Sequence, residues 1–147
     1  MERTLIILKP NAVQRALIGD VLARFEHRGL QIKGLKMQRI TRDLAERHYA
    51  EHKGKDFFAS LVDFITSGPS VLVVLEADCV IEIARSMCGP TDPCKAPPGT
   101  IRGDYGVHTQ LNIIHASDSP ESAEREIGIF FSAEELVEYR QATAPWV

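Results

Sequence analysis

Two unbroken apolar runs, Leu5 to Leu8 and Val71 to Leu75, constrain most strongly how this chain can fold. An unbroken run is typical of a β-strand covered on both faces, since a strand with one wet face alternates apolar and polar residues. Lys9-Pro10 follows the first run, and proline ends strand pairing there. We therefore expect Lys9 to emerge at the carboxyl end of a buried strand, and Val71 to Leu75 to be a central strand.

The segments between these runs predict helices and further strands. Apolar residues at helical spacing, together with capping residues, favour helices at four places before the last strand and one after it. These helices are expected over 12–28, over 41–52 with Thr41 as cap, over 56–67 with Asp56 as cap, over 78–87 with Asp78 as cap, and from Pro120 with Ser119 as cap. Leu30 to Ile40 alternates as a strand does, with a bulge or phase shift at Gly34.

The order of these elements reduces to βαββαβ with insertions. This pattern predicts an α+β, ferredoxin-like fold, a four-stranded antiparallel sheet with helices packed on one face. A length of 147 residues suits a single domain, 1–147. Near the end, Ser132-x-x-Glu135 is a capping box that favours a short helix to about Arg140, and Trp146 is expected to anchor the tail.

Composition excludes several classes of protein. A hydrophobic content of 44% with 25% charged residues is ordinary for a soluble protein, and a net charge of −3 gives no general attraction to nucleic acid or anionic lipid. No apolar run approaches the roughly 20 residues that span a bilayer, and no signal peptide is visible, so a cytoplasmic location is expected. The three cysteines lack zinc-ligand spacing and are interpreted as reduced thiols, with a bridge between Cys88 and Cys94 left open.

One histidine stands at a place suited to chemistry. Asn112 to Ile114 has the composition of a buried strand end, which puts His115 where the strand gives way to a turn. In the following helix, Glu126 flanks the apolar stripe and is placed to accept a hydrogen bond from an imidazole, which fixes its tautomer. A purely structural histidine is the alternative.

A phosphate site in this chain would have to be built from side chains. Neither GxxxxGK[ST] nor GxGxxG is present. Cations and neutral donors lie at element ends and loop edges, and together they suit a polyphosphate: Lys9, Arg85, Arg102, Thr91 and Asn112. A neutral histidine can attack phosphorus without a separate base, and the phosphohistidine formed can pass its group to a second acceptor.

Seven segments together resemble the nucleoside diphosphate kinase family over essentially the whole chain. They are Arg3 to Pro10, Gln14-Arg15, Phe57-Phe58, Ser67-Gly68-Pro69, Pro98 to Asp104, Asn112 to Ser119, and Glu121 to Glu124. The resemblance implies ping-pong transfer of the γ-phosphoryl group from a nucleoside triphosphate, usually ATP, to a nucleoside diphosphate. It also implies Mg²⁺ held mainly by the phosphates, and a homo-oligomer, commonly a hexamer and in some bacteria a tetramer.

The same resemblance assigns roles to individual residues. His115 matches the phosphorylated histidine and Glu126 the carboxylate that orients it, with Ser117 beside it. Lys9 would contact the ribose hydroxyl and phosphate, and Tyr49, expected on a rim, would bond near the transferring group. The nucleotide contacts are completed by the sugar-binding Asn112, by Arg85, Thr91 and Arg102 on the outer phosphates, and by Phe57 stacked on the base with Leu61 beneath it.

Two other interpretations belong to different classes. One is a ferredoxin-like binding or regulatory module, for nucleic acid or a small ligand, in which His115 is structural. Aliphatic strands and the charge of −3 argue against an RNA-binding module, and neither nucleic acid nor a membrane is required as a partner. The other is a histidine phosphocarrier with a protein partner, which would not explain a base platform at Phe57.

Overall fold

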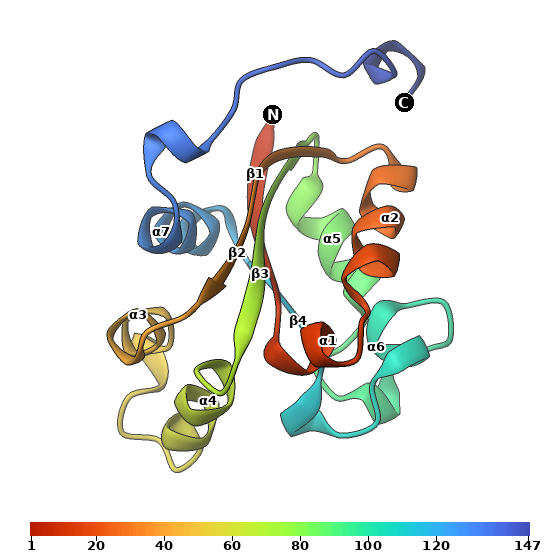
Figure 1. Cartoon of the computed structure of the whole chain (residues 1–147). Coiled ribbons are helices and arrows are strands. Elements are labelled where there is room, and N and C mark those ends of the chain that lie inside the picture. Colours follow the sequence, from red (N-terminus) through yellow and green to blue (C-terminus); the bar gives the residue numbers. More distant parts are fainter.

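A four-stranded antiparallel sheet runs through the centre of the protein, which we describe from a computed structural model covering residues 1–147 (Figure 1). Its strands are β1 (Glu2–Leu8), β2 (Gln31–Arg39), β3 (Pro69–Ala77) and β4 (Ile114–Ala116). The strand order β2-β3-β1-β4 puts both unbroken apolar runs in the two central strands. The fold is the expected ferredoxin-like α+β arrangement.

Helices cover both faces of this sheet, so the expectation of one covered face was wrong. The α-helices are α1 (Pro10–Gln14), α2 (Ile18–Arg28), α3 (Arg42–His48), α4 (Phe58–Ile65), α5 (Val80–Cys88), α6 (Ile101–Tyr105) and α7 (Pro120–Phe130). Ile6 and Leu8 of β1 pack with α1, α2 and α5, whereas Leu5 and Ile7 pack with α3, α4 and α7 on the other side. The unbroken run in β1 is buried because each alternate residue meets a different helical layer.

Several helix boundaries differ from the prediction. The helix expected over 12–28 is two helices, since the chain turns at Ala16, which has a φ of 59°. Asp56 and Asp78 do not cap α4 and α5; the N-cap residues there are Phe57 and Cys79, with no side-chain capping bond. Thr41 and Ser119 do cap their helices, since their hydroxyl oxygens accept hydrogen bonds from the amides of Leu44 and Ser122.

At the edges of the sheet, one prediction is confirmed and one feature was not predicted. The register of β2 against β3 shifts between Ile32 and Gly34, as the bulge prediction required. A Cβ at Gly34 would lie 3.0 Å from side-chain atoms of Leu136 and Phe131, which explains why glycine stands there. On the opposite edge, β4 begins only at Ile114 because Ile113 has a φ of 76°.

The C-terminal tail is held differently from the prediction. The capping box of Ser132 and Glu135 is present, but it starts only a 3₁₀ turn, Ala133–Glu135. Trp146 is 86% exposed and anchors nothing, so that expectation was wrong. The tail is held instead along β2, where Lys33 donates from Nζ to the carbonyl of Tyr139 and the Tyr139 hydroxyl donates to Ile32.

The long loop after α5 also contains structure that the sequence pattern did not show. A 3₁₀ turn spans Pro93–Lys95, and Thr100 caps the unpredicted helix α6 by accepting from the amide of Gly103. None of the helices has the length and apolar character needed to cross a membrane.

Candidate active site

A cavity of about 510 Å³ gathers nearly all of the predicted site residues. They reach it from both helical layers and from the ends of β1 and β4, although they lie far apart in the sequence. The predicted residues that line it are Lys9, Tyr49, Phe57, Leu61, Arg85, Thr91, Arg102, Asn112, His115 and Glu126. Ser117 does not line the cavity, because it is fully buried behind Glu126.

His115 forms the chemical centre of this cavity together with one carboxylate. It lies in the middle of β4, paired with Ile7, and not at the strand's end as predicted, because the strand starts only at Ile114 and continues to Ala116. Its Nε2 is 2.9 Å from Oε1 of Glu126 on α7. The Ser117 hydroxyl donates to the same oxygen at 2.6 Å. Burial acts to raise the pKa of Glu126, but the hydrogen bonds from His115 and Ser117 hold that pKa below its usual value.

The ionised carboxylate decides which nitrogen of His115 can react. An acceptor 2.9 Å from Nε2 places the imidazole proton on Nε2, since a carboxylate only accepts. The lone pair is therefore on Nδ1. A neutral imidazole with a free lone pair beside a cationic cavity is suited to attack an electrophilic phosphorus.

His48 is a site residue that the sequence reasoning missed. It is 3% exposed, and its ring lies edge-on to His115 with 4.7 Å between the centroids. Burial first, and then the neighbouring His115, lowers the pKa of His48 well below its usual value. His48 falls with Leu44 and Tyr49 on the weakly apolar face of its helix, but nothing in the pattern gave it a role in the site.

Lys9 and Asn112 lie together at the floor of the cavity. The Lys9 ammonium donates to Oδ1 of Asn112 at 2.8 Å, and Nδ2 of Asn112 donates to the carbonyl of Thr91 at 3.2 Å. Burial, reinforced by the positive charge of Arg102, lowers the pKa of Lys9 to about 7. The lysine is thus ready to gain a proton when an anion arrives.

The two arginines differ in how freely they can reach a ligand. Arg102 is buried, and it donates to the backbone carbonyls of Asn112, Gly89 and Ile114. It therefore fixes the loops around the cavity while contributing positive charge. Arg85 on α5 is exposed and is held by one bond, from Nη1 to the carbonyl of Ala116 at 3.1 Å.

The aromatic residues take different positions from those expected. Tyr49 is 8% exposed, so it is not on a rim; burial raises the pKa of its hydroxyl, which stays protonated. Phe57 is 45% exposed at the cavity edge, with the ring of His52 5.2 Å from its own. An exposed aromatic face of this kind can stack on a planar ligand.

The thiols take no part in this chemistry. All three cysteines are free, so the bridge between Cys88 and Cys94 is absent. Burial raises the pKa of the Cys88 thiol to about 11, which keeps it protonated at the cavity wall. Further lining residues without an assigned role are Glu51, His52, Ser60, Thr109, Gln110 and Asp118.

The sequence and the fold of this chain are similar to those of known proteins. The family model described as nucleoside diphosphate kinase matches residues 2–136. The nucleoside diphosphate kinase of Desulforamulus reducens is 57% identical over all of this chain and 99% of that protein, and that of Thermococcus kodakarensis is 59% identical over 99% of this chain and 85% of that protein. The structure of the Halobacterium salinarum nucleoside diphosphate kinase in complex with CDP has a TM-score of 0.97, with 47% identity over 99% of this chain and 97% of that one.

Proposed function

This chain belongs to the nucleoside diphosphate kinase family, and we propose that the cavity around His115 carries out the phosphoryl transfer. Members of this family are phosphotransferases that pass a γ-phosphoryl group from a nucleoside triphosphate to a nucleoside diphosphate through a phosphohistidine. The observation that carries the proposal is the hydrogen bond of 2.9 Å between Nε2 of His115 and Oε1 of Glu126. It lies in a cavity that Lys9 and Arg102 also line.

The first half-reaction uses the Nδ1 lone pair of His115. Nδ1 attacks the γ-phosphorus in line with the bridging oxygen, the bond to that oxygen breaks, and a nucleoside diphosphate leaves. The imidazole then carries a positive charge, which the Glu126 carboxylate stabilises, and Ser117 holds that carboxylate in place. In the second half-reaction, the terminal oxygen of another nucleoside diphosphate attacks the same phosphorus and His115 is restored.

The remaining site residues hold the nucleotide. Arg85, Thr91 and Arg102 bind the outer phosphates, and Lys9 contacts phosphate and ribose with Asn112 beside it. The Tyr49 hydroxyl donates a hydrogen bond close to the transferring group. Phe57, supported by Leu61, stacks on the base, and stacking without bonds to the base edge suits an enzyme that accepts several nucleosides.

The family needs a divalent cation for activity, and we propose Mg²⁺ in that role. The only cluster of three metal-ligating side chains in the chain is His48, His115 and Glu126, and two of these are imidazoles. Mg²⁺ prefers oxygen ligands and keeps several waters, so the nucleotide phosphates would hold it. There it would offset the negative charge of the transferring group.

The proposal also covers the domain organisation and the oligomeric state of the protein. We propose one catalytic domain, 1–147, that assembles as a homo-oligomer, with a hexamer favoured over a tetramer. Support comes from Leu35 and Met37, which are exposed on the edge strand β2, where apolar residues favour a protein contact. Analytical ultracentrifugation distinguishes a monomer, a tetramer and a hexamer. The cytoplasmic location stays a prediction.

The reaction is tested by following the phosphoryl group. The protein is mixed with γ-labelled ATP and Mg²⁺, freed of nucleotide, and then given GDP or dTDP. We expect an acid-labile, base-stable label that discharges onto the diphosphate. His115→Ala should take up no label, whereas His27→Ala, which alters an exposed histidine on α2, should label normally. Absence of label from the wild type, or equal labelling of His115→Ala, would reject the proposal and favour a binding module with a structural His115.

A further inference from the structure

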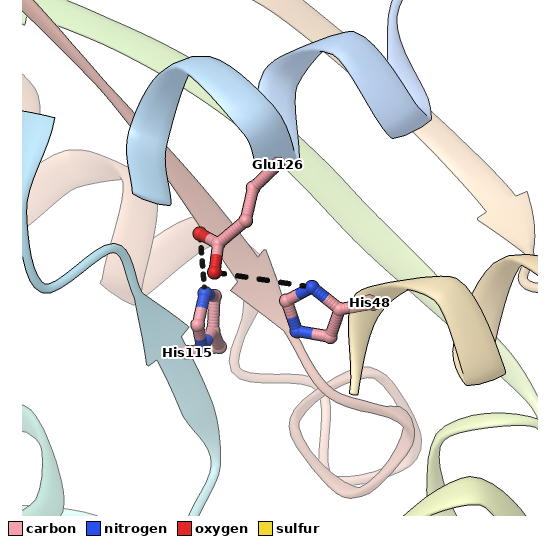
Figure 2. A group of neighbouring side chains, drawn as sticks. All are labelled: His48, His115 and Glu126. Atoms are coloured by element: carbon pink, nitrogen blue, oxygen red, sulfur yellow. Dashed lines mark hydrogen bonds and ion pairs between the residues drawn. The ribbon is translucent and has the colours of Figure 1, made fainter. Parts of the chain in front are cut away.

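Three metal-ligating side chains converge at the inner wall of the cavity (Figure 2). They come from separate elements: His48 ends α3, Glu126 lies on α7, and His115 lies on β4. Each offers one ligand atom, and these three atoms all lie within 4.8 Å of one another. Phosphoryl transfer as described above uses His115 and Glu126 but gives no role to His48.

His48 is the unusual member of this cluster. Its Nδ1 is buried and has no hydrogen-bond partner, although it faces Oε2 of Glu126 from 4.0 Å. A buried polar atom without a partner destabilises the folded protein. A cation placed between this nitrogen and the carboxylate would satisfy both groups.

We propose that His48, His115 and Glu126 form a binding site for Zn²⁺. Two imidazoles and one carboxylate are a donor set that this ion favours, with a fourth position left for water or a ligand. Zinc bonds of about 2.0–2.2 Å put tetrahedral ligand atoms about 3.4 Å apart. Nε2 of His115 is 2.9 Å from Oε1 of Glu126, and Nδ1 of His48 is 4.0 Å from the other carboxylate oxygen, Oε2, so both imidazoles lie near that spacing from the carboxylate.

The arrangement also explains access and selectivity. All three residues line the cavity, so the fourth position of the ion would face its open space. Mg²⁺ demands oxygen ligands and would not compete for two ring nitrogens. The site can therefore bind Zn²⁺ in the presence of the Mg²⁺ that accompanies the nucleotide.

Zinc binding changes the tautomer of His115. The ion bonds to Nε2 through its lone pair, so the single proton of the neutral ring moves from Nε2 to Nδ1. Nδ1 then has no lone pair for phosphorus, and Glu126 no longer accepts from the ring. Zn²⁺ thus blocks formation of the phosphohistidine; this consequence rests on the proposed function, whereas the binding itself does not.

Binding is tested by calorimetric titration of the nucleotide-free protein with ZnCl₂. A Cys79→Ser/Cys94→Ser background removes the two exposed thiols, which are competing zinc ligands. In that background, His48→Gln should weaken the affinity by at least about tenfold. The matched variant His52→Gln removes another histidine of the same cavity and should leave the affinity unchanged. Equal affinities in the parent and in His48→Gln would overturn the site.

A spectroscopic experiment avoids dependence on the folding of the variant. Zn²⁺ added to the parent protein should shift the NMR signals of the His48 and His115 rings and leave those of His27 in place. Shifts confined to other histidines would also overturn the proposal.

Inhibition is measured separately, as the rate of phosphoenzyme formation in excess Mg²⁺ with rising free Zn²⁺. The parent should lose labelling at the zinc concentration that fills the site. In His48→Gln, the same fractional loss of labelling, measured against the zinc-free rate of that variant, should require a zinc concentration at least about tenfold higher. Zinc binding at His48 and His115 without inhibition would reject the change of tautomer but not the site.

Discussion

One carboxylate oxygen of Glu126 accepts two hydrogen bonds in this cavity. Its Oε1 accepts from Nε2 of His115 and from the Ser117 hydroxyl, and the carboxylate is buried. In the proposed reaction, this negative charge keeps the proton on Nε2 and stabilises the imidazolium that phosphoryl transfer creates. A neutral amide of the same shape supplies no charge to stabilise the imidazolium, and its NH₂ group can donate to the ring and favour the other tautomer.

Replacement of this carboxylate should therefore affect the chemical step more than binding. Glu126→Gln is expected to slow formation of the phosphoenzyme by about 10²- to 10⁴-fold, with little change in the affinity for ADP. Rapid-quench measurement of a single turnover reports the rate directly. Glu124→Gln, an exposed change on the same helix, should leave it unaltered. A Glu126→Gln rate close to that of the wild type would show that the carboxylate does not act on His115.

We predict that Lys9 couples nucleotide binding to proton uptake. With its pKa lowered to about 7, only about one lysine in ten is charged at pH 8 in the free protein. A bound polyphosphate raises that pKa, so ADP binding at pH 8 should take up nearly one proton per site. Calorimetry in buffers of different ionisation enthalpy counts the proton. Arginine is always charged, so the Lys9→Arg protein should take up fewer protons on ADP binding. An unchanged proton count in this variant would contradict the role of Lys9.

At the scale of single elements, helix α7 carries Glu126 and depends on its own cap. Ser119 accepts from the amide of Ser122 at 3.1 Å, and Pro120 occupies the first helical position. Ser119→Ala is expected to lower the free energy of unfolding by about 1 kcal/mol, while Ser119→Asp keeps the cap. Denaturant unfolding at one fixed protein concentration measures both. Equal midpoints for the two variants would contradict the capping role.

Helix α6 is held at one glycine against the preceding loop, residues 89–99, which contains four prolines. A Cβ on Gly103 would lie 2.0 Å from the carbonyl oxygen of Pro97, so the loop backbone would have to move. Gly103→Ala should cost about 1–3 kcal/mol of stability and raise the Michaelis constant for nucleotide, because the neighbouring Arg102 holds the cavity loops.

The matched control for this change is Gly128→Ala on α7, where a Cβ meets no atom within 4 Å. That substitution should raise stability by about 0.5–1 kcal/mol, as alanine does in an open helix position. Thermal unfolding and steady-state kinetics compare the two. Equal behaviour of both variants would show that the contact with Pro97 does not matter.

For the whole molecule, the sequence predicted the strands better than the layers. Leu5 to Leu8 indicated two-sided burial, but the simple βαββαβ scheme has helices on one face, and nothing local showed that α3 and α4 return to the other face. Capping was also misjudged: Asp78 resembles a cap, yet Cys79 takes the left-handed conformation that starts α5. Trp146 was misjudged because burial of a terminal residue depends on a docking surface that the local pattern does not describe.

For the site, too, some features were predicted from the sequence and others were not. The resemblance identified many of the residues that line the cavity, and half of these lie in the segments that carry it: Lys9, Phe57, Arg102, Asn112 and His115. It did not show that Tyr49 is buried or that Arg102 is bonded to three carbonyls, since these facts arise from packing between distant elements. His48 fell on the weakly apolar face of its helix, but no motif marked it as a site residue.

In the proposed reaction, Nδ1 of His115 receives the phosphoryl group while the other ring nitrogen, in contact with Glu126, stays protonated. ³¹P and ¹⁵N NMR of the phosphorylated protein, prepared with ATP and Mg²⁺ and then freed of nucleotide, identify the bonded nitrogen. We predict a single phosphohistidine, on Nδ1 of His115. Phosphorus on Nε2, or on any other residue, would contradict the account.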